Sequence, residues 1–219
     1  MREKTVRARE LIRDGMAIGM MALAFTIGTV SAQAAATSVM LYGDSLMAGY
    51  GLPAEDGFAA RLTAALAADS HDVTVVNASV SGDTSGAALE RLDWSLAERP
   101  DVVLLGLGGN DMLQGLPPAN LARNLEAILT RLKGDDIPVL LLGMKASPGL
   151  GADYVKSFDA VYPALAQQFD VPLYGFFLDG VALDSGLNQA DRIHPNAEGV
   201  KVIVSKLLPA VETLLAEQP

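Results

Sequence analysis

The chain has 219 residues, of which half are hydrophobic and 19% charged, a globular composition that excludes a disordered protein. A formal net charge of −10 argues against binding to nucleic acid or to anionic membrane surfaces. Cysteine is absent, which excludes disulfides, a thiolate nucleophile and cysteine-based zinc sites. Only two histidines, His71 and His194, could act as a catalytic base, and a histidine-rich metal site is equally disfavoured.

The first 34 residues have the pattern of a secretory signal peptide. Five basic residues precede an apolar run from Met16 to Val30, and Ala32-Gln33-Ala34 gives a small-x-small cleavage site. We expect cleavage after Ala34, leaving residues 35–219 as one domain in the periplasm or secreted. An uncleaved anchor is disfavoured because the run is short for a span of about 20 residues. Cleavage removes five basic and three acidic residues, leaving 11 and 23 and a net charge of −12.

Strands and helices alternate along the remaining chain. Apolar or β-branched runs predict five strands, at 38–41, 73–76, 102–105, 137–142 and 171–177. Apolar residues at helical spacing predict five helices, at 58–68, 84–97, 117–134, 155–169 with a perturbation near Pro163, and 196–215 with Pro209 as a candidate break or kink. This alternation predicts one three-layer α/β/α domain around a parallel sheet.

Two features of the connections bear on function. The glycine-rich segment 106–111 after the third strand fits neither G-x-G-x-x-G nor a P-loop, so we reject a nucleotide site there. His71 precedes the second strand and therefore lies at the wrong end of a parallel sheet for catalysis, so we interpret it as a solvated loop histidine.

Ser45, Gly82 and Asn110 each follow a different predicted strand. The carboxyl ends of parallel strands share one edge of the sheet, where ligands bind, so these residues should lie close together. Asp191 precedes His194 by three residues and can take the proton on one ring nitrogen, which frees the other as a base. Pro195 restricts the backbone of His194 and helps to fix its position.

These residues meet the needs of acyl transfer. Ser45 would be the nucleophile, His194 its base, and Asp191 would orient the imidazole. The backbone N–H groups of Ser45 and Gly82 and the side-chain amide of Asn110 would form the oxyanion hole. Taken singly, each residue has a simpler explanation as a turn, a positive-φ glycine or an Asx turn, but four coincidences in order at strand ends favour the catalytic interpretation. The chain lacks the G-x-S-x-G of α/β-hydrolases, so a different scaffold is needed.

The sequence resembles the GDSL, or SGNH, hydrolase family. The four family blocks are matched by Gly43-Asp44-Ser45-Leu46, by Ser81-Gly82-Asp83, by Gly109-Asn110-Asp111 and by Asp191 to His194. The runs 77–85, 107–111 and 169–173 are most similar to the periplasmic acyl-thioesterase/lysophospholipase/arylesterase subgroup. The resemblance implies a five-stranded flavodoxin-like sheet in the order 2-1-3-4-5, no metal or other cofactor, and the roles given above. It differs at Arg192, where the family often has glycine. We expect Arg192 to point outward or to line the cleft rim, where it could favour anionic head groups.

The substrate implied is a small acyl ester or thioester: an aryl ester, an acyl thioester or a lysophospholipid. Apolar side chains are predicted at the acyl site, and suit a fatty-acyl or aryl group: Met112, Leu113, Leu116 and Leu150. A carbohydrate O-acetyl esterase and a non-catalytic envelope binding protein are the alternatives. A flavodoxin-like redox or nucleotide module is disfavoured by acidic, aromatic-poor loops. We expect a monomer with no nucleic-acid partner and no stable membrane anchor after processing.

Overall fold

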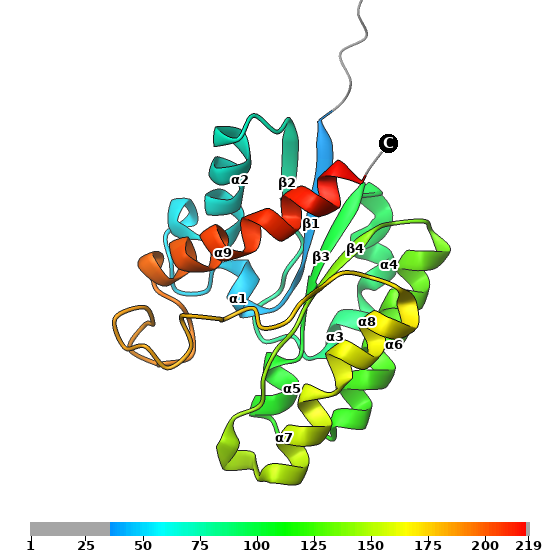
Figure 1. Ribbon diagram of the computed structural model, residues 1–219, viewed down its shortest axis with the longest axis vertical. Helices are drawn as coiled ribbons and strands as arrows, with labels where there is room; N and C mark the ends of the chain where they lie inside the picture. Colours follow the sequence, from blue (N-terminus) through cyan, green and yellow to red (C-terminus); the bar gives the residue numbers. More distant parts are fainter. Residues whose placement is uncertain (1–35, 218–219) are drawn as a thin grey trace, which may run out of the picture. The chain divides into compact units, whose positions relative to one another are not determined.

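The structure is a computed structural model that describes residues 36–217, so the predicted signal peptide lies outside the described residues. A parallel sheet of five strands runs through these residues in the order β2-β1-β3-β4-β5, as the sequence predicted (Figure 1). The strands are β1 (Thr37–Gly43), β2 (Val73–Asn77), β3 (Val102–Gly106), β4 (Val139–Leu142) and β5 (Leu173–Tyr174). The register pairs Gly43 of β1 with Gly106 of β3, so the two central strands end at the same level.

Helices cover both faces of the sheet and make three layers (Figure 1). Helices α2 (Phe58–Ala68) and α9 (Ala197–Ala216) pack together on one face. On the other face lie α3 (Ser85–Glu90), α4 (Leu92–Ser95), α6 (Pro118–Gly134), α7 (Ala152–Asp159) and α8 (Val161–Phe169). Two short helices, α1 (Ser45–Ala48) and α5 (Gly109–Leu113), begin directly after β1 and β3. Single 3₁₀ turns occur at 54–56, 96–98 and 148–150.

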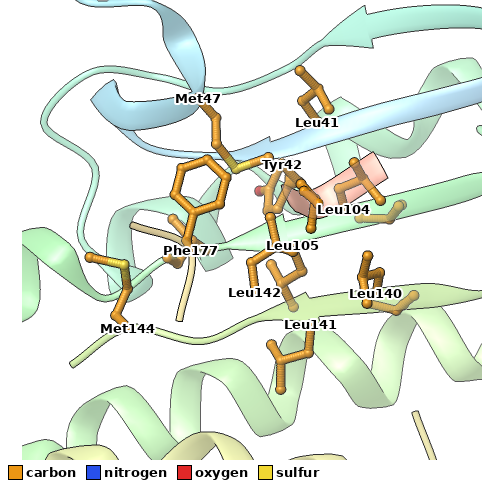
Figure 2. Packing of buried hydrophobic residues seen from close by; sticks show 14 of the residues in the cluster. Leu41, Tyr42, Met47, Leu104, Leu105, Leu140, Leu141, Leu142, Met144 and Phe177 are labelled. Atoms are coloured by element: carbon orange, nitrogen blue, oxygen red, sulfur yellow. The ribbon is translucent and has the colours of Figure 1, made fainter. Parts of the chain in front are cut away.

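The central strands are apolar without alternation because both of their faces are covered. Leu104 and Leu105 are neighbours on β3 and point to opposite faces, yet both are fully buried. Figure 2 shows the core near the carboxyl ends of the strands, where Met47 and Leu142 lie on one face of the sheet against Gly106. Tyr42 and Leu105, which are paired across β1 and β3, point to the other face, where the Tyr42 hydroxyl donates to the carbonyl of Ala88 on α3. The region that carries the site is therefore a close-packed part of the core.

The helix predicted at 84–97 is interrupted. Thr84 caps α3 by accepting a hydrogen bond from the N–H of Ala87 at 3.3 Å, as expected from its residue type. The helical hydrogen bonding then breaks at Arg91, which has φ −100° and ψ 4° and separates α3 from α4. The side chain of Arg91 is held by other parts of the chain, as described below, and propensity does not report such contacts.

Proline affects two predicted helices differently. The predicted helix 155–169 is two helices, α7 and α8, that meet at Ala160. Pro163 has no N–H to bond the carbonyl of Asp159, so the break occurs where the sequence indicated a perturbation. In contrast, α9 continues through Pro209 without a break. Pro209 and Ser205, whose carbonyl loses its partner, are both on the exposed side of α9, where water can bond that carbonyl.

Two further predictions were only partly right. The strand predicted at 171–177 pairs only at Leu173 and Tyr174, because the neighbouring strand β4 ends at Leu142. His71 lies in the loop before β2, as predicted, but its side chain is half-buried and not simply solvated. Its Nε2 lies 3.3 Å from Oε1 of Glu212 on α9, so it links the loop before β2 to the last helix.

Candidate active site

Ser45 lies where β1 ends and α1 begins. Asp44 caps α1, and its Oδ1 accepts a hydrogen bond from the N–H of Leu46 at 3.1 Å. The side chain of Ser45 is half-buried at the carboxyl edge of the sheet. This is the edge at which parallel α/β sheets bind their ligands.

Helix α1 approaches the sheet closely through Met47. A Cβ atom placed on Gly43 would lie 2.4 Å from Met47 Sδ and 2.7 Å from the carbonyl oxygen of Gly106. A side chain is excluded at Gly43 by these contacts, since real Cβ atoms do not approach other atoms so closely. The glycine of the sequence block therefore lets the serine-bearing helix sit directly on the strand ends.

The imidazole of His194 connects Ser45 to Asp191. Its Nε2 lies 2.8 Å from Ser45 Oγ, and its Nδ1 lies 2.6 Å from Asp191 Oδ2. A carboxylate only accepts hydrogen bonds, so Nδ1 carries the proton of this pair and Nε2 is free to accept from the serine hydroxyl. The structure thus brings Ser45 together with Asp191 and His194, which lie 146 and 149 positions later in the sequence.

Asp191 is held by three donors. Besides the imidazole, the backbone N–H groups of Ile193 and His194 donate to its Oδ1 at 2.9 and 3.0 Å. The Ile193 N–H has the largest effect, followed by the imidazole and the His194 N–H, and together they lower the pKa of Asp191 to about 2. The carboxylate is therefore ionised across the neutral range, although 37% of its side chain is exposed.

We call residues 178–196 the base loop because they carry Asp191 and His194. Side-chain amides add to the backbone hydrogen bonds of its turns. Asn188, which is buried, donates to the carbonyl oxygens of Val181 and Asp184 at 2.7 Å. The side chain of Asn196 donates to the carbonyl of Gly186 at 2.8 Å. One isolated bridge, between Asn188 and Pro195, closes the end of the loop.

Tyr50 and Gln189 support the base directly, and sequence reasoning missed both. The amide of Gln189 donates to the carbonyl oxygens of Tyr50 at 2.8 Å and of Pro195 at 3.0 Å. The backbone N–H of Gln189 donates to the carbonyl of His194 at 2.8 Å. The Tyr50 ring lies over the imidazole, with ring centroids 4.6 Å apart. These contacts join segments far apart in the sequence, so no spacing could have indicated them.

Gly82 lies in the loop between β2 and α3, and Asn110 lies in α5, which follows β3. Gly82 has φ +90°, and a Cβ there would meet nothing within 4 Å, so the backbone conformation alone favours glycine. Asn110 lies in the first turn of α5, where the sequence had predicted a loop. Its Nδ2 donates to the carbonyl of Asp83 at 2.9 Å. The contact with Asp44 Oδ2, at 3.5 Å, is long, which leaves the second amide hydrogen available to a ligand.

A buried pair, Ser85 and Asp111, joins α3 to α5. The N–H and hydroxyl of Ser85 donate to the two carboxylate oxygens of Asp111 at 2.7 and 2.6 Å. The amide of Asn124 donates to the same hydroxyl at 2.9 Å. Ser85 and Asp111 are adjacent to the segments that carry Gly82 and Asn110, so this pair sets the two segments relative to each other.

Arg91 binds both of the strand ends beside the nucleophile. Its Nε donates to Asp83 Oδ2 at 2.6 Å, Nη1 to the carbonyl of Ala78 at 2.7 Å, and Nη2 to the carbonyl of Gly43 at 3.3 Å. The guanidinium also lies 4.4 Å from the centre of the Tyr42 ring. Arg91 therefore ties the end of β1 to the loop that carries Gly82. Sequence reasoning missed it because its partners come from separate segments.

Asp44 is a buried carboxyl group next to the nucleophile, 2% exposed. Burial raises its pKa to about 6, and the charges of Asp111 and Asp83 act in the same direction, while the Leu46 N–H and His194 oppose the change. Asp44 therefore ionises at a higher pH than most carboxyl groups do.

A cleft of about 420 Å³ opens beside Ser45 and Asn110, a volume typical of small-molecule sites. Its apolar lining includes Met112, Leu113, Met144, Phe176, Leu178, Leu183 and Ile193. Two of the four predicted acyl-site residues, Met112 and Leu113, line it, whereas Leu116 and Leu150 do not. A larger polar hollow of about 650 Å³ lies at the opposite end of the strands and includes none of the four blocks.

Arg192 lines the same cleft, as expected of a rim residue. Its φ of +60° is in the left-handed region, which costs a residue with a Cβ about 1–2 kcal/mol. This explains why glycine suits the position in the family that the sequence resembles. Among residues 36–217, no group of three or more histidine, aspartate and glutamate side chains is placed to hold a metal ion, and no helix is long and apolar enough to cross a membrane.

Comparisons with known proteins agree with the fold and show the family. Residues 41–202 match the model of the GDSL-like lipase/acylhydrolase family. The chain is 41% identical to Esterase TesA of Pseudomonas aeruginosa over 84% of this chain and 92% of that protein. It is 38% identical to Thioesterase 1/protease 1/lysophospholipase L1 of Escherichia coli K12 over 83% and 86%. The crystal structure of AlinE4, described as an SGNH-hydrolase family esterase, superposes with a TM-score of 0.70 at 43% identity, covering 82% and 97%.

A serine, a histidine and an aspartate joined at the carboxyl edge of a flavodoxin-like sheet define a class of serine hydrolases distinct from the α/β-hydrolases. The chain belongs to the GDSL-like lipase/acylhydrolase family. The resemblance seen in the sequence and the predicted strand order are both confirmed.

Proposed function

We propose that this protein is a serine esterase that hydrolyses carboxylic esters and thioesters through an acyl-enzyme on Ser45. The observation that carries the proposal is the continuous contact from Ser45 Oγ through His194 to Asp191, at 2.8 and 2.6 Å. A binding protein has no need of a serine hydroxyl bonded to an imidazole that is itself oriented by an ionised carboxylate.

In the first half of the reaction, Ser45 Oγ attacks the substrate carbonyl carbon while its proton passes to His194 Nε2. Asp191, ionised because of its low pKa, stabilises the imidazolium. The N–H groups of Ser45 and Gly82 and the free amide hydrogen of Asn110 stabilise the oxyanion. His194 then gives the proton to the leaving oxygen or sulfur, and the bond between carbonyl carbon and leaving group breaks.

In the second half, water attacks the acyl-enzyme. His194 takes a proton from the water, the oxyanion forms again in the same hole, and the proton returns to Ser45 Oγ as the ester to the enzyme breaks. The products are the free acid and the regenerated hydroxyl. No other reactant is needed.

The cleft favours a fatty-acyl or aryl group over acetyl. Its lining is largely apolar and its volume far exceeds what an acetyl group fills. We therefore infer that aryl esters, acyl thioesters and lysophospholipids are better substrates than acetylated carbohydrates. The names of two relatives, an esterase and a thioesterase/lysophospholipase, support the same range.

The test is hydrolysis of p-nitrophenyl esters, from acetate to palmitate, by the mature protein, by Ser45→Ala and by the control Ser157→Ala. Ser157 is an exposed serine on α7 outside the cleft. We expect the wild type and the control to turn over equally and Ser45→Ala to lose about 10⁵–10⁶-fold. Equal rates for Ser45→Ala and wild type would remove Ser45 as the nucleophile.

A fluorophosphonate reagent tests the nucleophile without choosing a substrate, because it phosphonylates only activated serines. Mass spectrometry should locate one adduct at Ser45 in the wild type and none in Ser45→Ala. A wild type that neither reacts nor hydrolyses any ester would support the binding protein instead. A preference for acetate over longer chains would favour the O-acetyl esterase.

We also propose that residues 1–34 are a signal peptide, and that the mature protein, residues 35–219, is a single periplasmic or secreted domain that acts as a monomer. The first strand begins at Thr37, so cleavage after Ala34 would remove no described element. Intact-mass measurement of the protein released by osmotic shock should give a chain that starts at Ala35, and light scattering should give one chain per particle. A mass that includes Met16 to Val30 would contradict cleavage.

A further inference from the structure

The charge of the cleft is opposite to the charge of the protein. Three ionisable side chains line the cleft, namely Asp44, Lys145 and Arg192, and Asp44 is buried beneath the nucleophile. Both groups exposed to a ligand are therefore cations, in a chain with a formal net charge of −10. Such a local reversal attracts an anion to the site.

The two cations differ in how free they are. Lys145 Nζ lies 5.5 Å from the centre of the Phe176 ring, and its charge helps to lower the pKa of Asp179, after the larger effect of Lys206. Arg192 forms no salt bridge within the described residues. It also adopts a left-handed backbone conformation unusual for arginine. Arg192 is thus the cation more available to a ligand.

Arg192 lies on the side from which the leaving group departs. In the proposed reaction, His194 must give its proton to the leaving atom, so the leaving group sits beside the imidazole. Arg192 is two residues before His194, and its N–H donates to the carbonyl of Gln189. The N–H of Gln189 in turn donates to the carbonyl of His194. The acyl chain, in contrast, fits the part of the cleft lined by Met112, Met144 and Phe176.

The rim on this side is amphipathic. Leu183 and Ile193 line the cleft but are 93% and 42% exposed, and Leu183, like Arg192, has a left-handed φ, +67°. Leu183 and Arg192, two residues of the base loop with left-handed backbone, thus present an apolar and a cationic side chain at the same rim. A ligand with an acyl chain joined to an anionic group matches that combination.

We propose that Arg192 makes this enzyme selective for substrates whose leaving group carries a phosphate, so that the acyl chain occupies the cleft and the phosphate meets the guanidinium. The inference rests on the esterase function proposed above and adds to it the chemical class of the leaving group. Arg192 is a specificity-determining residue, and hydrolysis itself does not depend on it.

The experiment uses two esters with one acyl chain and leaving groups of opposite character. 4-Nitrophenyl octanoate has a neutral leaving group, and 4-(octanoyloxy)benzenesulfonate has an anionic one of similar size. We would measure kcat/KM for both with the wild type, with Arg192→Asn, whose new residue tolerates the left-handed conformation, and with Lys156→Ala. Lys156 is an exposed cation of α7 outside the cleft, so its variant carries the same change in net charge.

We expect Arg192→Asn to lower kcat/KM for the sulfonate ester about tenfold and for the neutral ester less than twofold, and Lys156→Ala to change neither. Raising the salt concentration should reduce the preference of the wild type and leave Arg192→Asn unaffected. An equal fall on both esters, or no fall on either, would overturn the selectivity. A wild type that hydrolyses neither ester, like Ser45→Ala, would instead overturn the proposed function, and with it this inference.

A phosphate can come from a lipid headgroup or from a phosphorylated thiol carrier, and a second pair of substrates separates them. Lysophosphatidylglycerol and octanoyl-coenzyme A carry phosphate on an oxygen and on a sulfur leaving group, respectively. The Arg192→Asn defect should exceed fivefold on at least one of them, and the larger defect identifies the source. If Arg192→Asn lowers kcat/KM for both of these substrates by less than twofold, although it lowers kcat/KM for the sulfonate ester, recognition of phosphate would be contradicted.

Discussion

The two sides of the catalytic centre are built in different ways. On one side, Ser45, Gly82 and Asn110 lie in the segments that leave β1, β2 and β3, and the half-buried Arg91 and the buried Asp111 hold these segments. On the other, Asp191 and His194 lie on the base loop, which is largely exposed and held by side-chain amides. The nucleophile side shares its supports with the core, whereas the base loop reaches the core only near Leu178, Val181 and Asn188.

This difference separates stability from turnover. Removing a group on the base loop should affect the reaction and leave the fold nearly unchanged. Removing a support on the nucleophile side should affect both, because the same side chains satisfy buried backbone groups. The following variants test whether turnover and stability respond separately on the two sides.

The largest effect is expected for Asp191→Ala. Without the carboxylate, the imidazole loses its orientation and the stabilisation of its charged form, so kcat should fall about 10⁴-fold. The melting temperature should stay within about 2 °C, because the side chain is more than a third exposed. Asp184→Ala, on the same loop, is the control and should keep near-wild-type turnover. A melting temperature that falls by 10 °C would place the base loop among the supports of the fold.

The low pKa of Asp191 also predicts the form of the pH profile. A carboxyl group with a pKa of about 2 stays ionised when the pH falls from 8 to 4, so Asp191 does not cause a loss of activity there. We expect kcat/KM to fall in this range, and the fall would report the general base, which accepts the Ser45 proton only in its unprotonated form. A rate that is flat from pH 4 to 8 would argue against histidine as the base.

Asn110→Ala should lower kcat about 10²–10³-fold with little change in KM, because the lost donor acts on the oxyanion and not on bound substrate. Asn120→Ala, in the first turn of α6 and outside the cleft, is a matched control because this asparagine is also half-buried, and its turnover should not change. Unchanged turnover in Asn110→Ala would remove this residue from the oxyanion hole.

Asp44→Asn tests the buried carboxyl group through stability. Its folded-state pKa of about 6 exceeds the ordinary 3.8, so the folded protein binds the extra proton between these values and stability falls as pH rises through pH 4 to 6. The loss is about 3 kcal/mol when complete. Asparagine can still cap α1 and does not ionise, so the variant should gain stability relative to wild type by up to that amount between pH 4 and pH 7.

Urea unfolding at four pH values measures the effect, with Asp153→Asn, an exposed carboxylate of α7, as the control. A constant difference between Asp44→Asn and wild type across the range would show that Asp44 does not titrate in the folded state as described.

Arg91→Ala should lower kcat about 10–100-fold and the free energy of unfolding by about 1–3 kcal/mol, since Asp83 and two carbonyl groups lose their donor. A positioning role predicts a change in kcat with KM constant, and partial recovery of kcat in Arg91→Lys or with added guanidinium. Recovery of stability without recovery of kcat would make the residue purely structural. Arg131→Ala, an exposed arginine paired on α6, is the control.

The sequence predicted the parts of the fold that depend on local pattern. The helix at 58–68 matches α2, because its apolar residues Phe58, Leu62 and Leu66 repeat at helical spacing and all three are buried. Where contacts from elsewhere decide, prediction failed. Asn110 was expected in a loop, yet it lies in α5, whose buried Asp111 is bonded to Ser85 from a distant segment.

The same division holds for the site. Ser45, Gly82, Asn110, Asp191 and His194 could be chosen from residue type and position after a strand, because their chemistry is their own. Arg91, Tyr50 and Gln189 act through backbone carbonyls and ring faces of distant segments. Any residue can offer a carbonyl, so such contacts leave no pattern in the sequence.

The seating of α1 on the sheet through Met47 has a consequence for oxidative damage. The chain contains no cysteine, so methionine is its sulfur target for oxidants. Met47, 1% exposed and enclosed by Gly43 and Gly106, is shielded, whereas Met112 is half-buried in the wall of the cleft (Figure 2 shows Met47 within the core). Oxidation would therefore make the acyl-binding surface polar first, and the protein would lose its hold on long acyl chains while its nucleophile remained in place.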